Sequence, residues 1–171
     1  MQDQVSTTRV ALKFGVLTAV AVIVYSTLIN LTGMTQNRAL TSLAFVILIV
    51  GIVLAMKEFR AQNNTFMSYG QGLGIGSLVS AIVGLIGSMF SMFYMEFIDN
   101  TIIKQSMDKA REDMEARGMD DAQIEQAMSM TEKFMTPGVM FAMGVLSYVI
   151  IGFILSLIIA AIMRKDKPVF E

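Results

Sequence analysis

Hydrophobic residues gather in four long segments that contain no charged side chain. These segments cover residues 14–37, 39–56, 61–95 and 134–163. A helix that crosses the hydrocarbon core of a bilayer, about 30 Å thick, needs roughly 20 such residues. The pattern predicts four membrane-spanning helices, near residues 11–31, 39–57, 72–96 and 139–163. We therefore expect an all-α, four-span transmembrane helical bundle in which residues 1–171 form a single membrane domain.

The composition changes abruptly between the third and fourth spans, where ten acidic and five basic residues lie between Glu96 and Thr136. Apolar residues still recur there at helical spacing, in two sets: Ile103, Met107, Ala110 and Met114, then Ile124, Ala127, Met128, Thr131 and Phe134. Gly118 suits the turn between two helices, and Asp120 with Gln123 resembles a capping box. Pro137 and Gly138 are expected to break the helix before the fourth span. The pattern predicts an extramembrane, acidic helical hairpin over residues 97–138.

The apolar face of this hairpin is open to two interpretations. The two helices can bury it against each other, or it can dock a partner. In the second case the expected contact residues are Met107, Met114, Ile124 and Met128.

Small residues recur at every fourth position of the third span and again on the fourth. The predicted helix-packing face consists of Gly72, Gly76, Ser80, Gly84, Ser88, Gly152, Ser156 and Ala160, with Gly144 on the same stripe. Small residues let helix backbones approach closely in lipid, where no hydrophobic drive holds helices together. We expect the third and fourth spans to form the tight centre of the bundle.

Basic residues favour one side of the four spans. The side shared by both termini and the 57–71 loop carries seven of them close to the membrane edge: Arg9, Lys13, Lys57, Arg60, Arg164, Lys165 and Lys167. Arg38 stands alone in the turn on the other side, and the basic residues of the hairpin mostly lie away from the membrane. The positive-inside rule therefore predicts that both termini are cytoplasmic.

The composition disfavours most enzyme classes. The chain has no cysteine and no histidine, which removes thiol nucleophiles, imidazole bases and the usual zinc ligands. The net charge of −1 gives no reason to expect nucleic acid. We interpret the 16 methionines as apolar filling rather than as a copper(I) site. No cofactor, metal or catalytic residue is expected.

A small group of polar residues marks the start of the third span. Asn63, Asn64, Tyr69 and Gln71 form a candidate polar cluster, although Tyr69 and Gln71 can also serve as interfacial anchors of a helix start. The glycine-rich segment 70–76 is not a nucleotide loop, because it lacks the lysine of that motif.

Three segments resemble a known family: residues 69–72 (Tyr-Gly-Gln-Gly), residues 118–127 around the hairpin turn, and residues 134–138 (Phe-Met-Thr-Pro-Gly). Together they resemble the domain-of-unknown-function family numbered 4199, small inner-membrane proteins found largely in Bacteroidota. The resemblance implies the bacterial cytoplasmic (inner) membrane, the same four-helix layout and, with cytoplasmic termini, a periplasmic hairpin. It implies no activity and no catalytic residues.

These observations favour a non-catalytic accessory or assembly subunit of a membrane complex. Its expected partners are the lipid bilayer and either another membrane protein or further copies of itself. The alternative is a small oligomeric transporter or channel, although no ionisable residue lies near the middle of a span. An intramembrane enzyme would have to act through carboxylates, tyrosine or an external metal.

Overall fold

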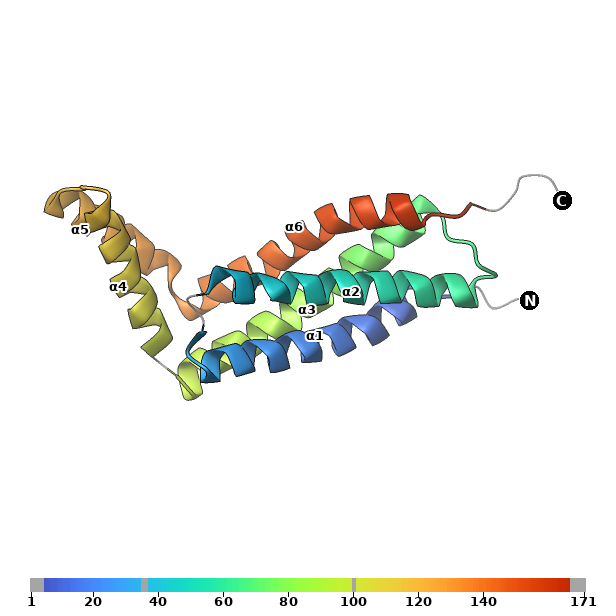
Figure 1. Cartoon of the computed structure of the whole chain (residues 1–171), viewed down its shortest axis with the longest axis horizontal. Coiled ribbons are helices and arrows are strands. Elements are labelled where there is room, and N and C mark those ends of the chain that lie inside the picture. Colours follow the sequence, from blue (N-terminus) through green and yellow to red (C-terminus); the bar gives the residue numbers. More distant parts are fainter. Residues whose placement is uncertain (1–4, 35–36, 100, 167–171) are drawn as a thin grey trace. The chain divides into compact units, whose positions relative to one another are not determined.

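The protein folds into helices throughout the residues described by this computed structural model, which are 5–34, 37–99 and 101–166 (Figure 1). Those residues form six helices: α1 (Thr7–Leu31), α2 (Arg38–Gln62), α3 (Tyr69–Phe97), α4 (Thr101–Ala116), α5 (Asp121–Phe134) and α6 (Pro137–Met163). The described part of the chain contains no strand, only an isolated antiparallel bridge between Met67 and Lys165. The predicted all-α class is therefore confirmed.

Four of the helices are long and apolar enough to cross a membrane. They are α1, α2, α3 and α6, and they contain the four segments predicted from hydropathy. Charged side chains are almost absent from their interiors. Helices satisfy their own backbone hydrogen bonds, so segments of this length and composition indicate a multi-pass membrane protein.

Each of these four helices is longer than the span predicted for it. Helix α1 begins at Thr7 because the Ser6 hydroxyl accepts a hydrogen bond from the Arg9 amide (3.3 Å) as its N-cap. Helix α6 begins at Pro137, where we expected a break. A proline at the first helical position needs no amide hydrogen bond, so the break falls just before it, at Met135 and Thr136.

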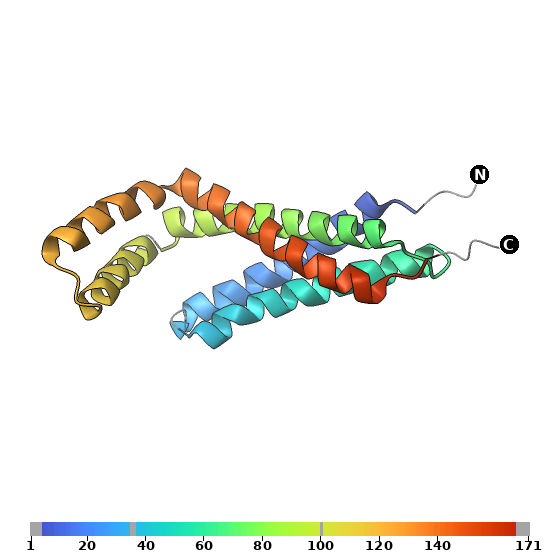
Figure 2. The same cartoon turned by 90° about the horizontal axis from the view of Figure 1, so that it is seen from above.

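The chain divides into two compact units, and each is described by itself. The first comprises Met1–Gly87 and Val145–Glu171, and so contains α1, α2, most of α3 and most of α6. Helices α1 and α2 pack side by side (Figure 2). The largest fully buried apolar side chains of this unit come mainly from α2 and α3: Leu48, Ile52, Met56, Phe59, Met67, Ile75, Val79 and Val83.

The second unit, Ser88–Gly144, contains the α4–α5 hairpin and the adjoining ends of α3 and α6. Helices α4 and α5 contact each other, in agreement with the predicted hairpin. Gly118 adopts a left-handed φ of 75° at the turn, a backbone conformation that favours glycine. Asp120 caps α5 by accepting a hydrogen bond from the Gln123 amide (2.8 Å), as the capping pattern predicted.

Candidate functional site

Small residues of α3 and α6 meet in a regular series of rungs in the first unit. Gly76 lies against Ser156, and Gly152 lies against Ser80. A Cβ atom placed on Gly72 would come within 3.0 Å of Ala160 Cβ, and one placed on Gly84 would come within 2.8 Å of Tyr148 Cβ. Each step of four residues forward along α3 is matched by a step of four backward along α6. The two helices are therefore antiparallel and in register on the predicted stripe.

The same register recurs in the second unit. A Cβ atom on Gly144 of α6 would overlap the hydroxyl of Ser88 on α3. Every member of the predicted face thus lies at the contact between these two helices. Backbones that approach this closely gain van der Waals contact along their length, which is how helices associate in lipid.

The two buried serines in the rungs of the first unit, Ser80 and Ser156, donate hydrogen bonds to carbonyls of their own helices. The Ser80 hydroxyl donates to the Gly76 carbonyl (2.9 Å), and the Ser156 hydroxyl donates to the Gly152 carbonyl (2.6 Å). Such bonds to the preceding turn satisfy a hydroxyl without a ligand or water. These hydroxyls are structural groups of the helix contact and are not available to line a polar path.

Two further close contacts could not be predicted from a repeat, because each depends on a single glycine. Gly51 of α2 lies against Thr18 of α1, and Gly15 of α1 lies against Ile82 of α3. A glycine is unfavourable within a helix unless something requires it, and that cost is the signal that could have identified them.

The members of the candidate polar cluster make different local contacts. The Asn63 side-chain amide donates to the Phe66 carbonyl (2.9 Å) and so shapes the loop that connects α2 and α3. The Gln71 side chain accepts from the Ser68 amide (2.9 Å), while Gln71 donates its own amide to the Ser68 hydroxyl (3.3 Å). This reciprocal pair is a capping box at the start of α3. Tyr69 packs, partly buried, against the core of the first unit.

The α2–α3 loop is joined to the segment that follows α6. Met67 and Lys165 exchange backbone hydrogen bonds of 2.9 and 2.8 Å, N to O. Asn64 and Thr65 adopt left-handed φ values of 50° and 69°. That region is unfavourable for a β-branched residue such as threonine, so the surrounding contacts must hold it in place. We call residues 63–67 with Lys165 the clasp.

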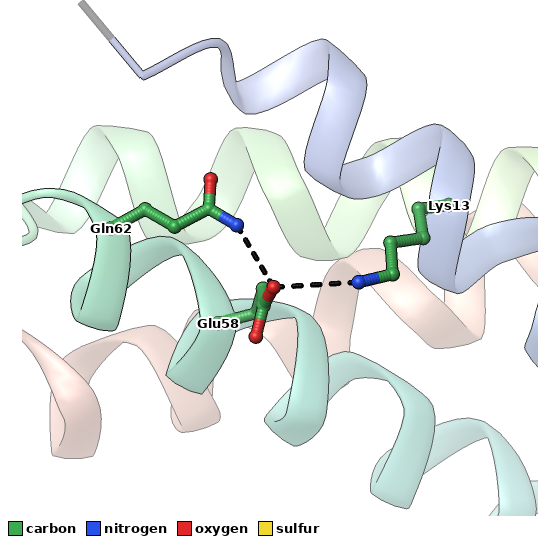
Figure 3. Close-up of polar contacts among 3 residues, drawn as sticks. All are labelled: Lys13, Glu58 and Gln62. Atoms are coloured by element: carbon green, nitrogen blue, oxygen red, sulfur yellow. Dashed lines mark hydrogen bonds and ion pairs between the residues drawn. The ribbon is translucent and has the colours of Figure 1, made fainter.

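The first unit has one ion pair between described residues of different helices. Glu58 of α2 accepts from Lys13 Nζ of α1 at 3.4 Å and from Gln62 Nε2 at 2.8 Å (Figure 3). The Lys13 side chain is 58% exposed and that of Glu58 34%, so solvent screens much of the attraction. This cluster ties the start of α1 to the end of α2, which places the clasp and the N-terminal end of α1 at the same end of the unit.

The residues predicted as possible partner contacts are buried or half-buried in the second unit. Ile124 is buried, with 1% of its surface exposed, and Met107, Met114 and Met128 are half-buried. Phe134, predicted to lie on the apolar face, is 62% exposed, and Met130 one turn before it is 56% exposed. The sequence pattern missed Met130 because it lies off the apolar stripe.

Acidic side chains of the second unit are solvated or act as caps. Asp99 accepts from both the amide and the hydroxyl of Thr101 (3.0 and 2.6 Å), and these bonds hold the pKa of Asp99 below its ordinary value. Within the described ranges, no group of three or more acidic side chains is arranged to hold a metal ion.

The comparisons with known proteins identify a family but no characterised relative. A family model described as "Protein of unknown function (DUF4199)" matches residues 13–165. No curated protein and no solved structure matches the chain. The match covers nearly the whole sequence and confirms the resemblance carried by the three short segments, so this protein belongs to the DUF4199 family.

Proposed function

We propose that this protein is a non-catalytic accessory or assembly subunit of a complex in the bacterial inner membrane. In this account the first unit anchors the chain in the bilayer, and the α4–α5 hairpin of the second unit provides the contact surface. Both termini are cytoplasmic and the hairpin is periplasmic.

The observation that carries the proposal is the apolar surface left uncovered on the hairpin. Met130 and Phe134 lie one turn apart on α5 and are both exposed, in a helix whose other exposed residues are mostly polar or charged. Exposed aromatic and methionine side chains that interrupt a polar surface are typical of protein contacts. The partner that fits is a membrane protein with an apolar pocket and a basic rim, which would complement the acidic residues around it.

The first unit supports a structural role. Ser80 and Ser156 donate to carbonyls of their own helices. Ser68 and Gln71 cap the start of α3. Gly76 and Gly152 lie in the contact between α3 and α6. None of these groups is left over for binding a substrate. A unit built in this way is suited to anchor the chain in the membrane.

The placement of basic residues supports the orientation. Six cationic residues flank the helix ends at the clasp end of the first unit: Arg9, Lys13, Lys57, Arg60, Arg164 and Lys165. Lys167, also predicted there, lies outside the described residues. Basic residues next to spans stay in the cytoplasm. Because α3 is a single span, the hairpin that follows it would then be periplasmic.

The alternative, a small oligomeric transporter or channel, has weaker support. A path for solutes needs polar groups that are free to face it. Ser77 of α3 has a buried hydroxyl without a hydrogen-bond partner, but it stands among apolar neighbours in the sequence. Thr27 of α1 donates to the carbonyl of Ile23 (2.8 Å), as the buried serines do to their own helices.

The proposal is tested by purifying the protein in mild detergent from its native host, followed by mass spectrometry and sizing. We expect a stoichiometric partner with the wild-type chain, and its loss from a Met130→Ser/Phe134→Ser double variant. A Gln126→Ser/Ser129→Ala double variant on the same helix is the matched control and should keep the partner. A homo-oligomer without partners, or a partner retained by the Met130→Ser/Phe134→Ser variant, would contradict the proposal.

A further inference from the structure

Two cations converge on one residue of the clasp. Arg60 Nε donates to the Thr65 carbonyl, and Lys165 Nζ donates to the Thr65 hydroxyl, each at 3.4 Å. Arg60 lies in the last turn of α2, and Lys165 follows the end of α6. Among the described residues neither forms an ion pair. Two like charges are therefore held next to the same threonine, and neither has a carboxylate of the described part of the chain within ion-pair distance.

The loop that holds Thr65 between these cations is fixed by several bonds. The Thr65 amide donates to the Arg60 carbonyl (2.7 Å), and the Phe66 amide donates to the Asn63 carbonyl (3.0 Å). The Met67–Lys165 bridge fixes the other side, and Lys165 Nζ also lies 5.6 Å from the centre of the Phe66 ring. Backbone strain at Asn64 and Thr65 is thus maintained by its surroundings, as is common where a loop presents a binding group.

Unused donors remain around Thr65. Arg60 employs only Nε in its bond to the loop, which leaves the two terminal guanidinium nitrogens. Lys165 has three ammonium hydrogens, of which the Thr65 hydroxyl accepts one, and that hydroxyl retains its own hydrogen. Lys57, one turn before Arg60, and Arg164 are exposed and add to the positive field. A planar guanidinium, an ammonium and a hydroxyl together suit the oxygens of a phosphate group.

We propose that Arg60, Thr65 and Lys165 form a binding site for the phosphate of an anionic phospholipid. The residues flank the ends of two membrane-spanning helices, at the level where headgroups lie. The bound phosphate neutralises the two cations and fastens the segment after α6 to the α2–α3 loop. This site rests on the membrane placement of the chain and is independent of the accessory role.

The test titrates the detergent-solubilised full chain with phosphatidylglycerol or with phosphatidylcholine of the same acyl chains. Bound lipid is counted by native mass spectrometry, and the thermal unfolding midpoint is followed in parallel. We expect phosphatidylglycerol to bind in preference and to raise the midpoint. Each cation removed should weaken binding about five-fold, which corresponds to about 1 kcal/mol. An Arg60→Gln/Lys165→Gln double variant should therefore show the largest loss.

Two controls separate a specific site from general charge. A Lys104→Gln/Lys133→Gln variant makes the same charge change at exposed hairpin residues and should bind phosphatidylglycerol as the wild type does. The Arg60→Lys variant keeps both positive charges, so it tests the site even if the double variant does not fold. It should bind phosphatidylglycerol more tightly than the single variant Arg60→Gln does. Equal losses in the hairpin and clasp variants, or equal affinity for the two lipids, would overturn the proposal. A midpoint raised as much by inorganic phosphate would show that the ligand is a soluble anion instead.

Discussion

Ser80 of α3 and Gly152 of α6 lie so close together that a methyl group on residue 152 would overlap both the Cβ and the hydroxyl of the serine. Turning the hydroxyl to another rotamer would leave the Cβ overlap in place. The contact therefore depends on glycine at position 152, and it is one rung of the series that holds α3 and α6 together in the first unit.

Replacing Gly152 by alanine should destabilise the protein. The added methyl forces the two helices apart, at a cost of about 1–3 kcal/mol for overpacking. Gly74→Ala is the matched control, because nothing lies within 4 Å of a Cβ atom placed there. Both substitutions gain the same helix propensity, up to about 1 kcal/mol. Unfolding in detergent should show Gly152→Ala less stable than Gly74→Ala, and equal stabilities would mean that the rung is not close-packed.

The capping box at the start of α3 gives a second prediction. Gln71→Ala removes the acceptor for the Ser68 amide and should lower the free energy of unfolding by about 0.5–2 kcal/mol. Gln71→Glu keeps an acceptor and adds a negative charge near the positive end of the helix, so it should be at least as stable as wild type. Should both variants lose stability equally, Gln71 would have a role other than capping.

Asp99 gives a pH-dependent prediction in the second unit. Its two bonds from Thr101 lower its pKa below the ordinary 3.8. Because the folded-state pKa is the lower one, its contribution to stability is fully present above pH 3.8 and is lost as the pH falls through the folded-state pKa. Thr101→Val removes the hydroxyl donor, and a carboxyl-carbon NMR titration should show the Asp99 pKa rise toward 3.8. Thr131→Val, on α5, should leave that titration unchanged, whereas an unmoved pKa in Thr101→Val would refute the assignment.

The Lys13–Glu58 pair should contribute little to stability. Both side chains are substantially exposed, so a double-mutant cycle with Lys13→Gln and Glu58→Gln should give a coupling of about 0.2–1 kcal/mol. The coupling should fall as salt is added, because salt screens exposed charges. A coupling that is larger and insensitive to salt would show that the pair is shielded from water when the protein is in its membrane environment.

The sequence was sufficient to predict the helices and the helix face, but not the partners across that face. The four-residue repeat from Gly72 to Ser88 marks one side of α3, and Gly152, Ser156 and Ala160 mark one side of α6. Shifting one helix by four residues would match small residues almost equally well, so the pairing of Ser80 with Gly152 could not be read from the repeat. Register depends on the whole set of neighbouring side chains.

Other features could not be predicted, either because they link residues far apart in the sequence or because one residue type can have several roles. Met67 and Lys165 are far apart in the chain, and no pattern marks a two-residue bridge between them. Gln71 could be a ligand group, an anchor or a cap, and only the position of Ser68 decides among these. Hydropathy located the apolar part of each span but not the polar helical turns at its ends. The start of α1 is an example, because it is set by the N-cap Ser6.

If the chain spans the membrane four times with cytoplasmic termini, as proposed, the clasp lies in the cytoplasm and the hairpin turn lies in the periplasm. The chain has no cysteine, so single-cysteine variants can be labelled without background. Ala61→Cys lies at the exposed end of α2 and Arg117→Cys in the exposed hairpin turn. A membrane-impermeant maleimide should label the Arg117→Cys variant in intact cells and the Ala61→Cys variant only after lysis. Labelling of both variants in intact cells, or of the Ala61→Cys variant alone, would contradict the account.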